Sequence, residues 1–316
     1  TGIQKVECRI AWIPASAGMT HRTCGLAMLL GYNTNGFAHH DLLDAVRVLG
    51  QLGYQSVAIT IDHHALPPGR EWTSRQLTEL RRLLESFGME SVIETGARYL
   101  LDPWHKHQPT LMSPDPEGRR RRMEFYRHAL RMAGELGSRC VSVWSGQLPE
   151  GTSEQVAMDR LIDGLAELVA ESRACGVPIG LEPEPGMFID TMARYEAVLG
   201  RLDAPELRLT LDIGHLICQG ETPPESYIRR WAPRLVNVHL EDMRPGRHEH
   251  LMFGEGEVPL GAVLAALAEV GYPGGVHVEL SGHSAQAPQT AQMVYQFLRP
   301  YWEKLGQPLR HPRGEK

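Results

Sequence analysis

The sequence predicts a closed (β/α)8 barrel, and three observations support this fold class. Short apolar runs alternate with segments of helical periodicity over most of the chain. Strands that alternate with helices form a parallel sheet, and eight such pairs close into a barrel. The length of 316 residues suits a barrel of one domain. A doubly wound nucleotide-binding sheet is the runner-up, but no G-x-G-x-x-G opens a helix after a strand and no G-x-x-x-x-G-K-[ST] occurs.

The expected strands are apolar runs of strand length. In chain order they cover 26–32, 56–61, 91–94, 140–144, 177–182, 207–212, 235–240 and 276–280. The expected helices have apolar residues at core-facing spacing, and glycine ends several of them, as Gly53 and Gly137 do. These helices cover about 39–52, 74–87, 119–136, 154–175, 191–202, 224–231, 260–270 and 286–301.

Residues 26–306 are therefore expected to form a single barrel domain. Residues 1–25 show no clean periodicity, and we expect an extension that is poorly ordered or foreign to the native chain. Residues 307–316 are expected to form a polar tail. Within the barrel, the connection 95–118 is long and rich in proline, histidine and aromatic residues, which is typical of a lid or binding loop.

Composition excludes several classes of function. The net charge is −6, and no basic footprint for nucleic acid is present, so a small carbohydrate-like substrate fits better. No apolar run approaches the roughly 20 residues of a membrane helix. Five scattered cysteines without a C-x-x-C pair suit the reducing cytoplasm. Lysine occurs only at Lys5, Lys106, Lys304 and Lys316, outside every expected strand, which disfavours a Schiff-base aldolase. The sequence is compatible with a homo-oligomer.

Four of the later strands end in side chains that bind metals: Glu182, Asp212, His239 and Glu279. Because parallel strands end at one rim of a barrel, we expect these side chains to converge on one divalent cation. Glu182 and Glu279 are expected to face each other across the lumen and to act as an acid–base pair that works through an enediolate-type intermediate. The plainer alternative is that each glutamate begins a helix at the surface.

A second group of histidines follows the same strands. His215 completes a D-x-x-H pattern with Asp212 and would contact the substrate or a second ion. His248 and His250 are two residues apart, so an extended backbone puts both on one side, as a second metal site requires. The alternatives are a capping or packing role for His215 and a solvated charged loop for the other two.

Further polar or aromatic side chains lie on the predicted rim. For each of them alone, a purely structural role is an equally good interpretation. As candidate substrate contacts we name His215, Arg244, Arg247, Asn33, His63, Glu94, Trp144 and Glu184.

The chain resembles the xylose isomerase-like TIM barrels over about residues 26–301. The motifs are Glu-Pro-Glu-Pro-Gly at 182–186, Leu-Asp-Ile-Gly-His at 211–215, Val-His-Leu-Glu-Asp at 238–242 and Val-Glu-Leu at 278–280. The resemblance implies Mn, Mg, Co or Zn held by Glu182, Asp212, His239 and Glu279. It also implies Glu182 and Glu279 as the acid–base pair and His215 as a substrate contact.

The expected function is a metal-dependent isomerase or epimerase of a sugar, sugar phosphate or polyol. An inosose-type dehydratase is an alternative on the same site. An alternative of another class is a non-catalytic accessory or binding protein that keeps the barrel. An AP endonuclease ranks last, because the further histidines of that branch are missing after the earlier strands, although His248-Glu249-His250 resembles its later pair.

Overall fold

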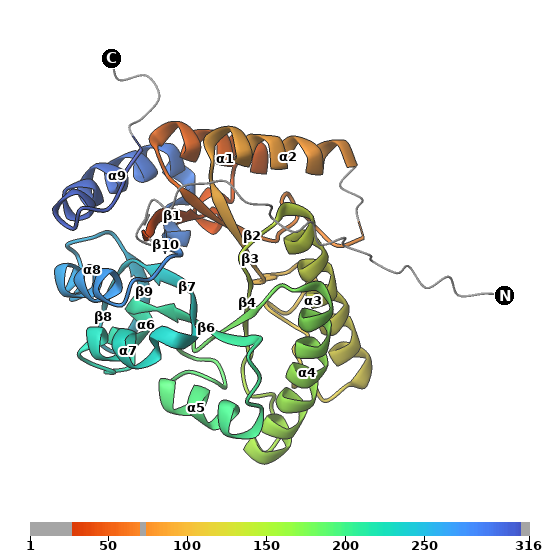
Figure 1. Ribbon diagram of the computed structural model, residues 1–316. Coiled ribbons are helices and arrows are strands. Elements are labelled where there is room, and N and C mark those ends of the chain that lie inside the picture. Colours follow the sequence, from red (N-terminus) through yellow and green to blue (C-terminus); the bar gives the residue numbers. More distant parts are fainter. Residues whose placement is uncertain (1–26, 70–73, 311–316) are drawn as a thin grey trace, which may run out of the picture.

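The computed structural model describes residues 27–69 and 74–310, and its central feature is a closed barrel of parallel strands (Figure 1). The ring order is β1-β10-β7-β6-β5-β4-β3-β2, which confirms the predicted fold class. The barrel strands are β1 (Leu29–Asn33), β2 (Ser56–Thr60), β3 (Glu90–Glu94), β4 (Val141–Trp144), β5 (Ile179–Glu182), β6 (Leu207–Asp212), β7 (Leu235–Leu240) and β10 (Gly275–Val278).

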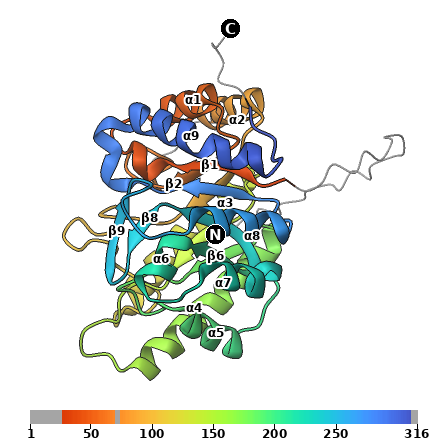
Figure 2. The same cartoon turned by 90° about the vertical axis from the view of Figure 1, so that its left-hand side faces the viewer.

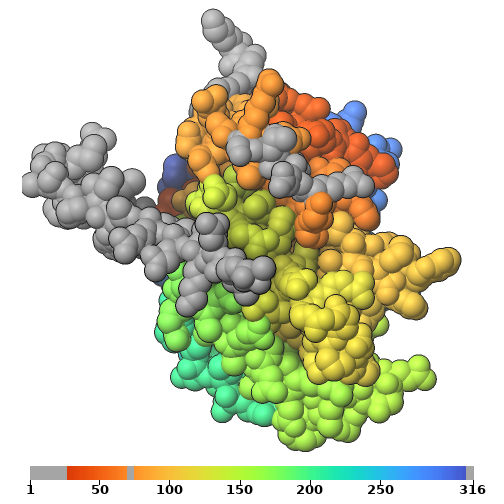
Figure 3. Space-filling view, turned by 90° about the vertical axis from the view of Figure 1, so that its right-hand side faces the viewer, coloured from red at the N-terminus to blue at the C-terminus, as the bar shows by residue number. Residues whose placement is uncertain are grey.

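Helices surround the barrel, and most neighbours in sequence, such as α3 and α4 or α7 and α8, pack side by side around it. Figure 3 shows the face formed mainly by the first half of the chain, coloured from orange through yellow to green. The last helix, α9, packs on α1. None of the helices in the described ranges is both long and apolar enough to span a bilayer. The outer helices are α1 (Leu42–Leu52), α2 (Ser74–Phe87), α3 (Pro116–Leu136), α4 (Glu154–Cys175), α5 (Met192–Arg201), α7 (Pro224–Trp231), α8 (Leu260–Glu269) and α9 (Ala287–Lys304).

Predicted and observed boundaries differ by a few residues, mainly where a capping residue sets the first turn. Asp41 accepts a hydrogen bond from the Leu43 amide at 2.9 Å, so α1 begins after it and not at residue 39. Asp115 caps α3 in the same way and moves that helix start forward from residue 119 to Pro116. The predictions for residues 1–25 and 311–316 lie outside the described residues.

Two elements at the carboxyl-terminal end of the barrel were missed. A short helix, α6 (Ile213–Cys218), follows β6 directly. The predicted loop after β7 is instead a hairpin of β8 (Asp242–Arg244) and β9 (Arg247–Leu251), which turns at Gly246 with a φ of 70°. Both elements lie toward the left in Figure 2. The 3-10 turns are η1 (Thr34–Phe37), η2 (Ala232–Arg234) and η3 (Ser281–Gln286).

The barrel interior holds a chain of buried polar groups. His277 Nδ1 lies 2.8 Å from Asn237 Oδ1, and its Nε2 lies 2.8 Å from Ser56 Oγ. Glycine on the neighbouring strand makes room for this ring, since a Cβ at Gly31 would lie 2.4 Å from His277 Cδ2. Asn237 Nδ2 donates in turn to Glu94 Oε1 at 2.8 Å, so this series of hydrogen bonds extends to the end of β3.

Candidate functional site

Four predicted ligands lie together at the carboxyl-terminal ends of the barrel strands. Glu182 and Asp212 are the last residues of β5 and β6, His239 lies near the end of β7, and Glu279 follows β10 directly. Each offers one ligand atom, and these atoms lie within 4.8 Å of one another. We call this set the strand-end cluster: Glu182, Asp212, His239 and Glu279.

His239 lies at the centre of the strand-end cluster. Its Nδ1 is 2.9 Å from Glu279 Oε2 and 3.1 Å from Glu182 Oε1. The opposite ring nitrogen, Nε2, is 2.9 Å from Glu94 Oε1. Because a carboxylate only accepts hydrogen bonds, Glu94 keeps the hydrogen on Nε2 and leaves Nδ1 as the nitrogen that faces the other carboxylates.

The two glutamates reach this imidazole from strands that are not directly opposite. β6 and β7 alone separate β5 from β10 on that side of the ring, whereas opposite strands of this barrel would have three strands between them. The predicted placement directly across the lumen was therefore wrong by one strand. Both carboxylates still approach the same atom of His239, so the expected convergence does not depend on a diametric arrangement.

Burial and mutual charge shift the titration of the strand-end cluster. Burial raises the pKa of Glu182 well above its usual value, and the charge of Glu279 adds to that rise. Burial acts the same way on Glu279, but the charge and hydrogen bond of His239 outweigh it and lower the pKa of Glu279. Burial would lower the pKa of His239, whereas Glu182, Glu94 and Glu279 raise it well above the usual value. The surrounding carboxylates therefore stabilise a positive charge at this point.

The donor set and one unpaired oxygen fit a divalent cation. Three carboxylates and one imidazole suit cations of the Mn, Mg, Co or Zn type. Asp212 is 1% exposed, and its Oδ2 makes no hydrogen bond while lying 3.8 Å from His239 Nδ1. A buried anionic oxygen without a partner is costly, and a cation shared by the four side chains would remove that cost.

Two predicted substrate contacts border the strand-end cluster. Glu184 lies two residues beyond Glu182, and burial together with the charge of Glu279 raises the pKa of Glu184 to about 7. His215 lies in the first turn of α6. Asp212 caps that helix by accepting a hydrogen bond from the His215 amide at 2.9 Å.

Three predicted contacts are engaged in other interactions. Asn33 Oδ1 accepts hydrogen bonds from the Asn35 amide and from Thr60 Oγ1. Trp144 is 7% exposed, and its ring packs edge-on against His107 at 5.0 Å, which leaves little ring face for a sugar. Glu94 is held beneath His239 as described above, so the structure places it as a positioning group and not as an open contact.

The remaining predicted contacts lie on exposed surface. His63 is exposed just after β2, and Arg247 is exposed at the start of β9. Arg244 is also exposed, and its Nε donates to the Glu255 carbonyl oxygen at 2.9 Å. The structure does not bring these three side chains into hydrogen-bonding contact with the strand-end cluster.

Sequence reasoning missed two residues that touch the predicted ones. Asn35 Nδ2 donates to Glu279 Oε1 at 2.7 Å, which leaves Oε2 to face His239. Glu241 is fully buried, and its Oε1 lies 3.9 Å from His250 Nδ1. Period-two alternation could have identified Glu241, because residues two apart on an extended strand share a face and Glu241 is two residues after His239.

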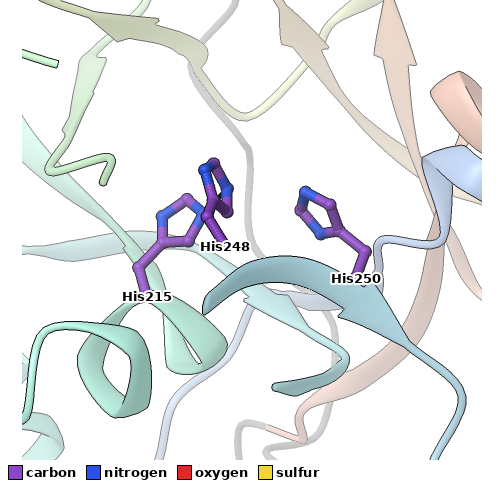
Figure 4. Close-up of side chains that lie close together, drawn as sticks. All are labelled: His215, His248 and His250. Atoms are coloured by element: carbon purple, nitrogen blue, oxygen red, sulfur yellow. Dashed lines mark hydrogen bonds between the residues drawn. The ribbon is translucent and has the colours of Figure 1, made fainter. Parts of the chain in front are cut away.

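The three remaining histidines form a second group beside the first (Figure 4). His215 comes from α6, while His248 and His250 come from β9, and we call these three residues the histidine cluster. Their candidate ligand atoms lie within 4.8 Å of one another. Burial lowers the pKa of His215 to about 4. Burial would also lower the pKa of His250, but Glu241 outweighs it and raises that pKa to about 10.

Comparison with known proteins identifies the family to which this arrangement corresponds. The family model described as xylose isomerase-like TIM barrel matches residues 46–301. Among related sequences, an L-ribulose-5-phosphate 3-epimerase of Salmonella paratyphi C is 24% identical over 249 residues, which cover 78% of this chain and 84% of that protein.

Solved structures show the same fold. A D-tagatose 3-epimerase-like protein superposes with a TM-score of 0.71 at 23% identity, covering 88% of this chain and 98% of that protein. The IOLI protein, whose structure has a bound zinc atom, superposes with a TM-score of 0.68 at 18% identity, covering 88% of this chain and 98% of that protein.

Proposed function

This chain belongs to the xylose isomerase-like TIM barrel family, and on that premise we propose that it is a metal-dependent sugar isomerase or epimerase. The observation that carries the proposal is that Glu182 and Glu279 both lie near 3 Å from the same nitrogen of His239. Two carboxylates that approach one point from different strands can act on one carbon from different sides. The epimerases among the related sequences and structures support the same reaction class.

The proposed substrate is an α-hydroxy ketone, free or phosphorylated. One glutamate, as carboxylate, removes the proton from the hydroxyl-bearing carbon next to the carbonyl. The electron pair of that C–H bond forms the carbon–carbon double bond of an enediolate, and the carbonyl electron pair moves onto oxygen. The other glutamate, in its acid form, returns a proton to the opposite face. The carbon is then inverted, and the two glutamates have exchanged protonation states.

Other side chains of this chain hold that pair in place. Asn35 binds Oε1 of Glu279 at 2.7 Å and thereby fixes which oxygen faces the substrate. Glu182, Asp212, His239 and Glu279 would hold the divalent cation. When bound, such a cation would act as a Lewis acid that favours loss of the proton beside the carbonyl. The bound zinc of the structurally similar IOLI protein supports this part of the proposal.

Solvent-deuterium exchange tests the proposal. We expect the metal-loaded protein to incorporate deuterium into a ketose from a panel of free and phosphorylated sugars. Glu182→Gln and Glu279→Gln should each lower the exchange rate by about 100-fold or more, because a positioned acid or base typically contributes about 10²–10⁴-fold. Glu249→Gln is the matched control, since that glutamate is exposed on the opposite face of β9 from His248 and His250.

Two outcomes would overturn the proposal. Wild-type rates of exchange in both glutamine variants would refute the acid–base role of Glu182 and Glu279. Absence of exchange across the whole panel, in protein shown by elemental analysis to hold a divalent cation, would favour a binding role for the barrel. The isolated product separates the rival reaction, because a dehydratase would release water from the substrate and leave an unsaturated or deoxygenated ketone.

A further inference from the structure

We propose that Lys106 binds the anionic end of the substrate at the mouth of the barrel, so that the substrate is a sugar phosphate or a sugar acid. Lys106 lies in the connection between β3 and α3, residues 95–115, which we call the rim loop. Its side chain is exposed, and its ammonium group pairs with no carboxylate within residues 27–69 and 74–310. An unpaired cation on a loop beside an active site is a candidate ligand contact.

The first argument is that the rim loop is anchored on both sides of Lys106. Arg122 of α3 is fully buried, and its Nη2 donates to the carbonyl oxygen of His107 at 2.6 Å. Arg121 Nη1 donates to the carbonyl oxygen of Leu101 at 3.0 Å. The backbone on either side of Lys106 is therefore held in place, and only the lysine side chain has to be ordered when a ligand binds.

The second argument is the place at which the rim loop is anchored. His107 Nδ1 lies 2.5 Å from the carbonyl oxygen of Gly96, and the His107 ring packs edge-on against Trp144 at 5.0 Å. Trp144 ends β4 and is paired in register with Glu182 at the end of β5. Lys106, the residue before His107, is thus carried beside the strand ends that hold the proposed acid–base pair.

The third argument is the reach of the Lys106 charge. That charge acts on Glu184, which follows β5, and on His248 in β9, so it is felt on two sides of the barrel mouth. Arg98, the arginine of the same loop, is engaged elsewhere, because its Nη1 lies 3.5 Å from Asp62 Oδ2. Lys106 therefore offers the rim loop an ammonium group that is free to meet a ligand.

The charges of the site decide which end of a substrate Lys106 would meet. The strand-end cluster contains three carboxylates, which repel a second anion at the floor of the site. A substrate that presents its ketone to this cluster must therefore direct a phosphate or carboxylate outward. A lysine ammonium binds either group as a point charge. The identity of the ligand as a substrate rests on the proposed function, whereas the anion site itself does not.

Binding of inorganic phosphate tests the site without turnover. Phosphorus NMR would follow phosphate titrated into the Mg²⁺-loaded protein. Lys106→Met should weaken binding by about tenfold, because a charge-assisted hydrogen bond is lost. Lys106→Arg keeps the charge and should keep most of the affinity. Because Lys106 is exposed, neither change endangers folding.

Lys304→Met is the matched control. Lys304 is also exposed, and it ends α9 near Gln307, whose Oε1 accepts a hydrogen bond from the Met28 amide just before β1 begins. This lysine therefore lies toward the opposite end of the barrel, and the control should bind phosphate like the wild type. Equal affinity in Lys106→Met and the wild type, or an equal loss in Lys304→Met, would overturn the anion site.

Kinetics with three related substrates identify the anion. Deuterium exchange would be measured with a neutral ketose, its phosphate ester and the corresponding keto acid. Lys106→Met should raise KM by about tenfold for the acidic substrate that the site accepts, with kcat unchanged and the neutral ketose unaffected. An unchanged KM for both acidic substrates would refute the inference and leave the proposed reaction intact. Phosphate binding that depends on Lys106 without any exchange would refute only the reaction.

Discussion

The strand-end cluster and the histidine cluster differ in what holds them. The first is carried by β5, β6, β7 and the end of β10, which are barrel strands tied to neighbours on both sides. The second is carried by a helix of six residues and by a hairpin that forms its own two-stranded sheet. The barrel thus places the proposed acid–base pair rigidly, whereas the hairpin can change without altering the barrel.

The difference also appears in exposure. The exposed fraction of the side chain is 7% for Glu182 and 14% for Glu279, the most open member of the strand-end cluster. His248 is exposed and His250 is partly exposed at the rim. The strand-end cluster is therefore the better shielded from water of the two, which suits the proposed proton transfer.

Asp212→Asn should have the largest effect, because Asp212 faces both clusters. Asparagine still caps a helix, so the change removes mainly the charge. A structural zinc site is worth about 10–16 kcal/mol, so the loss of one of four ligands should cost about 2.5–4 kcal/mol of binding free energy at the strand-end cluster. The zinc affinity of the histidine cluster, the second metal site predicted from the sequence, should fall less, by about tenfold. That is the lower end of the effect of groups that contact a metal ligand without binding the metal.

Calorimetric titrations with two metals measure the metal affinity of each cluster in the wild type and in the variant. Asp163→Asn, on the exposed face of α4, is the control. An unchanged affinity at the histidine cluster would show that Asp212 belongs to the strand-end cluster alone. An unchanged affinity at both clusters would remove Asp212 from the ligands.

Asp242→Ala should affect the hairpin and spare the barrel. The Asp242 carboxylate accepts hydrogen bonds from the amides of Met243, Gly254 and Val258 at 3.1, 2.8 and 3.0 Å. Hydrogen bonds to a charged group contribute about 1.5–3 kcal/mol, and the freed amides regain water in part, so the free energy of unfolding should fall by about 3 kcal/mol.

Urea unfolding measures that free energy. Zinc titration should show that zinc binding at the histidine cluster is lost while binding at the strand-end cluster is unchanged. Asp115→Ala is the matched control, because it also removes a carboxylate that accepts from two amides but lies at the start of α3. Equal weakening of both clusters in the Asp242 variant would mean that the hairpin supports the barrel rim as well.

The same difference explains what could be predicted from the sequence. Glu182, Asp212, His239 and Glu279 each close an apolar run, and the barrel geometry alone brings such positions together. The hairpin gave no comparable signal, because Arg247 to Leu251 is polar and charged and its pairing depends on the turn at Gly246. Glu94 also ends a strand and so looked like a rim contact. Its partner, Asn237, lies in the interior of a strand distant in the chain, which no local pattern reveals.

Glu94→Gln should have the smallest effect and should distinguish the clusters most sharply. Glu94 touches no predicted ligand except His239, at 2.9 Å, and acts by fixing the ring. Glutamine keeps an acceptor for Asn237 but loses the charge, so the affinity of the strand-end cluster should fall by about tenfold, and by about 100-fold in Glu94→Ala.

Glu90→Gln is the control on the same strand, since Glu90 is exposed and pairs with Arg139 at the surface, where such pairs contribute about 0–1 kcal/mol. The histidine cluster should keep its zinc affinity in both Glu94 variants, because the barrel interior does not hold the hairpin. If zinc binding at the histidine cluster falls as far as at the strand ends, His239 is positioned jointly with the hairpin, and the two clusters form one unit.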